Sequence, residues 1–394
     1  MSERRTTVLG ALLTTLGPIS MAIYTPAMPQ LVLAFGTTEA AIKLSLSMFF
    51  AGFALAQLVA GPLSDALGRK PVTLAFLVIY LAGSLLAAFA PTVEFILAAR
   101  LIQGIGASVG VVVGRALVRD LFSGPDASRI LNTIGIFLAI GPAMGPTLGG
   151  LMLAAFSWHA VFLLMIGFGL IAAFSTMRFL RETVLPDRSR LQPARLIGNY
   201  VEVARNPQFL AAAMVLSGTI GALYAQATML PFVLINRVGL APMEFGIGML
   251  MQSGFYLMGS VALKLVVGRI GGLQAARTGI LLCGIGAVAM AASVAFLEPF
   301  FLSIMGPVAI CTFGLAFLSP YIITLSLAPF PHIAGSASAL TGFLQMSAGF
   351  VGGTAAAIVG DPLHAFGIII PVMELSAVAG FIWLRQLSRS RPQT

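Results

Sequence analysis

Long runs of apolar residues with almost no charge recur along this chain, and they limit its fold more than any other feature. A helix crosses the bilayer core with about 20 apolar residues. Of the 394 residues, 58% are hydrophobic and 9% are charged, whereas soluble domains carry about 25% charged residues. The runs are longer and less broken than the alternating strands of a membrane β-barrel. We therefore expect an all-α membrane protein with twelve transmembrane helices, near residues 7–32, 42–63, 72–90, 94–116, 130–155, 160–180, 209–235, 245–266, 274–296, 300–327, 337–359 and 363–384.

A polar segment in the middle of the chain divides these helices into two groups of six. We predict an N-terminal half at 1–180, a cytoplasmic linker at 181–208 and a C-terminal half at 209–394. The halves look related, because Tyr24 has a counterpart in Tyr224, and Gly68-Arg69 has one in Gly268-Arg269. Pseudo-symmetric six-helix repeats of this kind occur in transporters.

The positions of the basic residues predict the orientation of the chain. With the amino terminus inside, 19 of the 22 Lys and Arg residues lie on the cytoplasmic side, Lys43 and Arg237 lie outside, and Arg100 lies within a helix. Short cytoplasmic loops are enriched in Lys and Arg, so both termini are expected in the cytoplasm. The net charge of +9 is then a topology signal, and we expect no nucleic-acid partner.

The loop after the second helix carries the most specific motif, Gly61-Pro62-Leu63-Ser64-Asp65-Ala66-Leu67-Gly68-Arg69-Lys70. Its glycines allow close packing and a tight turn. Asp65 and Arg69 are four residues apart, so they can pair with each other or with a neighbouring helix end. A purely topological loop would explain the cations but not the acid or the glycines.

Two further helices carry unusual residues. In 94–116, Arg100, Gln103 and Gly104 share one face, and a buried Arg is costly enough to indicate function, although snorkelling towards the outer surface is an alternative. In 130–155, Gly141, Gly145 and Gly149 recur every four residues and form a flat stripe for helix contact. The whole string also contains Pro142, Pro146 and Gly150.

These motifs resemble the major facilitator superfamily. The resemblance implies that the loop latches the cytoplasmic ends of the two halves, with Asp65 meeting the start of the eleventh helix and Arg115 or Arg119. It links Arg100 to proton movement, and the glycine-proline string is similar to the motif of drug antiporters. Helix 1 and Arg115 to Phe122 look like the bicyclomycin and chloramphenicol resistance branch of the twelve-helix drug/proton antiporters. That branch has an aspartate where this chain has Ala22.

Two sets of residues are candidates for the site. Glu374 is the one acid of 13 at mid-depth in a predicted span. Because a buried acid favours its neutral form, Glu374 joins Arg100 as a candidate for proton coupling. The alternative is a purely structural role, as a protonated side chain. In the family the cavity is lined by helices 1, 4, 7 and 10, and helices 2 and 8 add to it. The candidate substrate-binding residues are aromatic, Met and amide side chains, namely Met21, Tyr24, Met28, Phe49, Phe53, Tyr224, Gln226, Gln252, Phe255 and Tyr321.

The expected function is multidrug or antibiotic efflux by drug/proton antiport across the bacterial inner membrane, for small and largely neutral compounds such as amphenicols. Uptake or export of a metabolite is the alternative, and a membrane-embedded enzyme is a remote one. We expect no cofactor, no metal and no obligate protein partner, with the proton gradient as the energy source. Cys283 and Cys311 lie in apolar runs and do not indicate a metal or redox pair.

Overall fold

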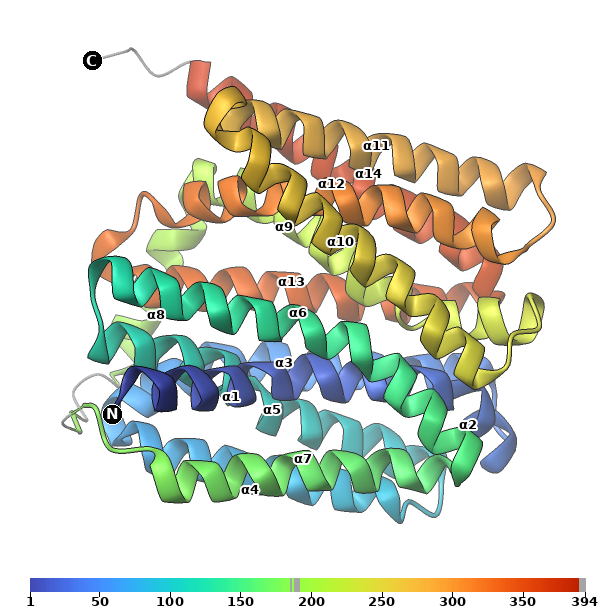
Figure 1. Ribbon diagram of the computed structural model, residues 1–394, viewed down its shortest axis with the longest axis horizontal. Coiled ribbons are helices and arrows are strands. Elements are labelled where there is room, and N and C mark those ends of the chain that lie inside the picture. The colour runs from blue at the N-terminus through green and yellow to red at the C-terminus, as the bar shows by residue number, and fades with distance from the viewer. Residues whose placement is uncertain (185, 188–191, 390–394) are drawn as a thin grey trace. The chain divides into compact units, whose positions relative to one another are not determined.

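A computed structural model describes residues 1–184, 186–187 and 192–389. Parts of the predicted linker and of the C-terminal tail, 185, 188–191 and 390–394, lie outside the described residues. The described chain is helical throughout (Figure 1), and twelve of its helical segments are long and apolar enough to cross a membrane. The expectation of an all-α membrane protein with twelve spans is confirmed.

The helices follow the predicted spans closely. Their bounds are α1 Glu3–Tyr24, η1 Thr25–Ala27, α2 Met28–Ala34, α3 Glu39–Leu67, α4 Arg69–Ala88, α5 Val93–Leu121, α6 Gly124–Ala155, α7 Trp158–Phe179, α8 Pro193–Ala204, α9 Pro207–Gln226, η3 Phe232–Arg237, α10 Pro242–Ile270, α11 Gly272–Phe296, α12 Phe301–Leu327, η4 Pro331–Ile333, α13 Ala334–Val359 and α14 Pro362–Arg389. The seventh span differs from the prediction, because α9 ends at Gln226 and the chain continues as turns and the π-helical η3.

Large apolar side chains cover much of the outer surface. Leu33, Phe296 and Ile358 are each more than four-fifths exposed, at 83%, 85% and 82%. Water would strongly disfavour such a surface, whereas lipid tails accept it. The surface therefore agrees with the membrane location that the apolar runs predict.

The chain divides into two compact units. The first comprises Met1–Ile197 and Ala241–Ile247, and the second comprises Gly198–Leu240 and Gly248–Thr394. Within the first unit, α5 packs against α1, α3 and α4, while α7 lies beside α4 (Figure 1). Glycines allow α3 and α5 to touch through their backbones: a Cβ added to Gly52 would lie 2.2 Å from the carbonyl oxygen of Leu101, and one added to Gly104 would lie 2.2 Å from that of Phe49.

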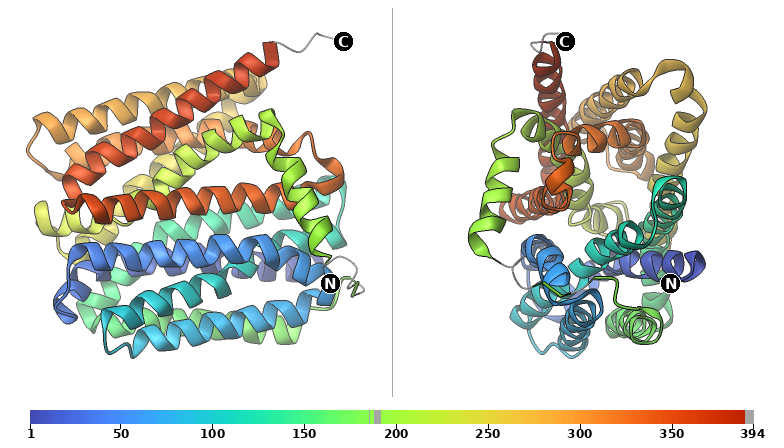
Figure 2. Two further views of the ribbon diagram at one scale, coloured as in Figure 1. Left: turned by 180° about the vertical axis from the view of Figure 1, so that it is seen from behind. Right: turned by 90° about the vertical axis from the view of Figure 1, so that its left-hand side faces the viewer.

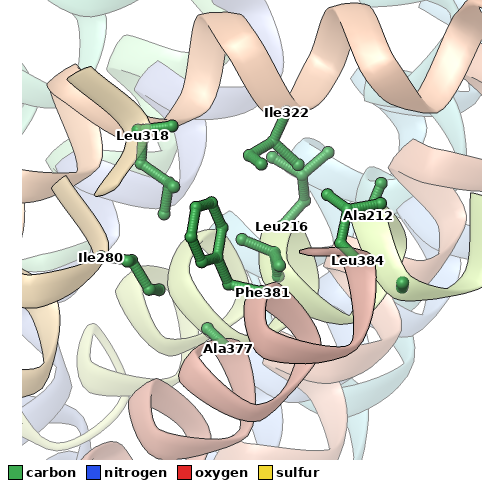
Figure 3. Close-up of a cluster of buried hydrophobic side chains, with 11 residues drawn as sticks. Ala212, Leu216, Ile280, Leu318, Ile322, Ala377, Phe381 and Leu384 are labelled. Carbon is green, nitrogen blue, oxygen red and sulfur yellow. The ribbon is translucent and has the colours of Figure 1, made fainter. Parts of the chain in front are cut away.

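Within the second unit, α11 packs against α12 and α14, and α9 contacts α12, α13 and α14 (Figure 2). Apolar side chains from α9, α11, α12 and α14 meet in a buried cluster, in which the ring of Phe381 points towards Leu318 and Ile280 (Figure 3). This cluster anchors α14, the helix that carries Glu374, against three neighbours.

The two units also use glycine at corresponding turns. Gly68, between α3 and α4, has a φ of +104°, and Gly271, between α10 and α11, has a φ of +76°. Side chains rarely adopt such angles. The sequence pairs Gly68-Arg69 with Gly268-Arg269, but Gly268 lies inside α10 and the turn falls three residues later, at Gly271.

Candidate functional site

Arg100 of α5 is fully buried between two aromatic rings of the first unit. Its guanidinium carbon lies 4.4 Å from the ring centroid of Tyr24 in α1 and 4.4 Å from that of Phe49 in α3. The side chain has 0% exposure, so it does not reach the outer surface. The snorkelling alternative is therefore wrong, and three helices converge on the cation.

A short chain of hydrogen bonds holds the guanidinium in place. Arg100 Nη1 donates to Gln103 Oε1, and Gln103 Nε2 donates to Ser84 Oγ at 2.7 Å and to Met165 Sδ at 3.3 Å. Arg100 Nε and Nη2 are buried without a hydrogen-bond partner, and within the described chain no carboxylate pairs with this arginine. A desolvated ring face contributes about 2 kcal/mol, against a desolvation cost of several kcal/mol for a buried ion. The cation thus retains unused capacity to bind an acceptor.

The neighbours of Arg100 include several predicted substrate residues. Tyr24 Oη lies 2.5 Å from Ser45 Oγ, and Ser45 donates to a carbonyl of its own helix at 2.6 Å, so the tyrosine hydroxyl donates to the serine. Phe53 follows on the same face of α3, with its ring centroid 6.2 Å from that of Phe49. Met21 and Met28 are buried in the first unit, at 7% and 0% exposure.

A second cluster surrounds Arg69, at the predicted latch. The Arg69 side chain is only 2% exposed. It forms an ion pair with Asp65 at 2.5 Å, which lacks hydrogen-bond geometry, and donates from Nε to Asp120 Oδ2 at 3.0 Å and from Nη1 to Ser64 Oγ at 2.6 Å. Thr183 also donates to Asp120, at 2.8 Å. The cluster therefore ties the ends of α3, α4 and α5 together.

Glu182 completes this cluster from the segment after α7. Its carboxylate accepts from the backbone N–H of Arg69 at 2.7 Å and of Lys70 at 3.2 Å, so it caps the amino end of α4 where the helix dipole favours an anion. A Cβ at Gly68 would lie 2.7 Å from Glu182 Oε2. A side chain at Gly68 would displace this carboxylate, and the positive φ itself favours glycine.

Within the loop itself, the basic partner of Asp65 is Arg69. The resemblance assigned Arg115 or Arg119 to Asp65, and the side chains of both are exposed near the end of α5. From α5, Asp120 reaches the loop and pairs with Arg69. An acid directly after Arg119 was the available signal for this contact. Gly61 has only ordinary contacts, its added Cβ lying 3.5 Å from Val112.

The glycines of α6 face α1. An added Cβ would lie 2.6 Å from Thr15 Cγ2 at Gly141, 2.4 Å from Ala22 Cβ at Gly145, and 2.2 Å from the carbonyl oxygen of Ile23 at Gly149. These three glycines let α6 approach α1 closely. The α6 helix runs through Pro142 and Pro146, and Gly150 approaches the backbone at 242–243. Position 22, where the branch has an aspartate, therefore packs against α6.

The remaining candidates belong to the second unit. Glu374 and Gln226, each 4% exposed, line one small cavity. Tyr321 instead packs on the apolar cluster of Figure 3, beside Gly272. Tyr224, Gln252 and Phe255 are half-buried.

Comparison with known proteins identifies the family. The model of the Major Facilitator Superfamily matches residues 10–353. A D-xylose-proton symporter of known structure shares the fold, with a TM-score of 0.75, 13% identity and coverage of 96% of each chain. Because this identity is low, the structural match concerns the fold alone.

Relatives by sequence are bacterial transporters. The chain is 30% identical to an uncharacterized MFS-type transporter of Bacillus subtilis, YdgK, over 86% of this chain and 85% of the relative. It is 29% identical to a chloramphenicol resistance protein of Pseudomonas aeruginosa, over 82% and 77%, and 25% identical to multidrug resistance protein D of Escherichia coli, over 97% and 95%. With its twelve spans and a family match over most of its length, the chain belongs to the Major Facilitator Superfamily and is a multi-pass membrane transporter, not an enzyme.

Proposed function

We propose that this chain exports small, largely neutral compounds from the bacterial cytoplasm in exchange for protons, amphenicol-like antibiotics among them. Both termini lie in the cytoplasm in this proposal, and no cofactor or protein partner is needed. The observation that carries it is Arg100, a buried cation with two aromatic faces, two unsatisfied donor atoms and no acidic partner. The named relatives, a chloramphenicol resistance protein and a multidrug resistance protein, support the same substrate class.

The chemistry around Arg100 favours neutral ligands that carry oxygen acceptors. Nε and Nη2 can donate to a nitro, carbonyl or hydroxyl oxygen, while Tyr24 and Phe49 offer aromatic surface beside them. An amphenicol combines an aromatic ring with such oxygens. Because the side chain is fully buried, the transport cycle must uncover it before a ligand binds.

Alternating access requires each half to move as a body. The Arg69 cluster joins the ends of three helices and the segment after α7 through charged hydrogen bonds. We assign to it the role of a latch that keeps the cytoplasmic end of the first unit rigid, so that a movement of one helix is passed to the others. The close contact between α6 and α1 at Gly145 and Gly149 serves the same purpose deeper in the unit.

Arg100 cannot itself be the group that gains and loses the proton, because a guanidinium stays protonated in proteins. Position 22 carries Ala instead of an acid, and among the described residues of the first unit no carboxylate pairs with Arg100. In this proposal Arg100 supplies a permanent positive charge to the site, and the exchangeable proton is bound by another residue. The second candidate is a transporter of the same family that takes up or exports a metabolite.

The test is resistance and flux in a pump-deficient bacterial host. Expression of the chain should raise the chloramphenicol concentration that stops growth and should lower the drug content of the cells. Arg100→Ala should abolish both effects, and Arg100→Lys should restore little, because lysine lacks the planar fork of donors. Arg129→Ala is the matched control, since Arg129 is 62% exposed and should behave as wild type.

Direction decides between the candidates. Increased accumulation of a tested compound on expression would favour uptake over export. Unchanged resistance and flux for chloramphenicol and for a panel of neutral drugs, with the protein present in the membrane, would refute the proposed substrate class.

A further inference from the structure

Glu374 is an acid in the middle of a membrane-spanning helix. It lies near the centre of the 28-residue α14 and is 4% exposed. Its Oε2 atom is buried with no hydrogen-bond partner. The other acids of the described chain lie at helix ends or in the segments between helices. An isolated acid within the membrane, with an oxygen that has no hydrogen-bond partner, costs folding free energy. Packing alone does not explain why the chain has an acid at this position.

The carboxyl group lines a cavity of about 10 Å³ in the second unit, which is room for about one water molecule. Polar side chains from α9 and α12 line it as well, among them Thr219, Gln226, Cys311 and Thr312. No group of three His, Cys, Asp or Glu side chains suited to a metal ion occurs in the described chain. The polar lining and the size fit a proton and a water molecule.

The hydrogens of the surrounding hydroxyls already have acceptors, and both thiols lie close to backbone carbonyls. Thr219 donates at 3.0 Å and Thr312 at 2.6 Å to carbonyls of their own helices. Cys283 donates to the carbonyl of Cys311 at 3.6 Å, and Cys311 to that of Cys283 at 3.7 Å. Each group has one hydrogen, so each presents lone pairs to its neighbours. Apart from the thiol of Cys283, which also lies within hydrogen-bond reach of Glu374, this lining accepts a hydrogen bond from a protonated carboxyl and offers little to a carboxylate.

Gln226 differs from the rest of the lining because it carries two amide N–H donors. It is the last residue of α9, and the backbone then tightens, with Met229 N donating to Gln226 O at 3.0 Å, before the π-helical η3 begins. Irregular backbone within a span often marks a functional position. A small movement at this helix end would carry the amide donors towards or away from Glu374.

We propose, building on the proton exchange of the proposed function, that Glu374 binds the exchanged proton and that Gln226 stabilises its carboxylate when the proton leaves. In the present arrangement the carboxyl is neutral. Deprotonation releases one proton to water and leaves one negative charge on Glu374. This charge attracts the amide N–H donors of Gln226, and because Gln226 is the last residue of α9, the end of that helix moves with it. The titratable side chains next to Glu374 are the thiols of Cys283 and Cys311; α9 and α13 contribute no charged residue.

Proton binding can be measured without substrate. Infrared difference spectra of the purified protein in liposomes, recorded between about pH 5 and about pH 9, where buried carboxyls titrate, should contain a band of a protonated buried carboxyl. Glu374→Gln should lose it, whereas Glu298→Gln, at an exposed acid of the same unit, should keep it. Gln226→Leu should keep the band at pH values where the wild type has lost it. A band that survives in Glu374→Gln, or no titrating band in the wild type, overturns the proposal.

Transport supplies the second readout, with labelled chloramphenicol in the same liposomes. Glu374→Gln should retain exchange of the drug without a gradient and lose accumulation driven by a pH gradient. Full gradient-driven accumulation in Glu374→Gln would make this acid structural. If the wild type neither exchanges nor accumulates chloramphenicol, the proposed function fails, while the infrared titration still decides whether Glu374 exchanges a proton.

Discussion

Removal of the Arg69 side chain should destabilise the first unit strongly as well as slow transport. The side chain is 2% exposed and pairs with Asp65 and Asp120, whose side chains are 29% and 12% exposed. Loss of one partner from a buried ion pair costs about 3–5 kcal/mol. Because Asp65 can recover part of its hydration, we expect the lower end, about 3 kcal/mol, for Arg69→Ala.

The assay is thermal unfolding of purified protein in detergent, together with drug export in cells. For a unit of this size, about 3 kcal/mol corresponds to a fall in Tm of roughly 6–12 °C. Asp120→Ala should cost nearly as much, although the motif does not include it. The double variant should cost clearly less than the sum, because the two residues interact directly. The exposed Arg129→Ala is the control and should change stability by less than about 0.5 kcal/mol.

Three results would refute this reasoning. Additive effects of Arg69→Ala and Asp120→Ala would mean that their contact contributes nothing. An Arg69→Ala protein with unchanged Tm but slow transport would mean that the cluster acts only in a later conformation. Normal Tm and normal export together would leave the loop as a topological signal alone.

Three further predictions concern other parts of the molecule. For topology, an impermeant thiol reagent should label Glu298→Cys in intact cells and Ser388→Cys only after permeabilisation. The reverse pattern would contradict the predicted orientation. These two sites are chosen because both are exposed, whereas Lys43 is fully buried. Burial opposes ionisation of Asp361, but hydrogen bonds from His364 and the charge of Arg237 outweigh it and lower the pKa of this carboxyl. The stability that Asp361→Asn removes should therefore be present above the unfolded-state value of about 4 and should vanish as pH falls through the lower folded-state value, which unfolding at several pH values checks. Gly149→Ala places a Cβ 2.2 Å from a backbone oxygen of α1, so it should reduce stability by about 1–3 kcal/mol and lower both Tm and export. The control is Gly167→Ala, whose Cβ meets nothing within 4 Å and which should leave Tm unchanged. Equal Tm values for the two variants would contradict the α1–α6 contact.

Local sequence was sufficient for the spans. Each needs only a long apolar run, and the bilayer sets the length of that run regardless of neighbours. Two spans are exceptions: the first is interrupted by η1 between α1 and α2, and the seventh is predicted to continue to 235 although α9 ends at Gln226. Hydropathy records the environment of a segment and not its backbone hydrogen bonds, so this break at Gln226 could not be predicted.

The partners of the buried charges required the tertiary structure. The sequence alone indicated Arg100, because an Arg in an apolar run is costly, but its position between Tyr24 and Phe49 depends on the packing of three helices. Likewise Asp65 and Arg69 are close in the sequence and pair across the Gly68 turn, while Asp120 and Glu182 reach the same arginine from more than 50 residues away. Periodicity defines the face of a helix on which a side chain lies, and only the packing of other helices against that face decides what it meets.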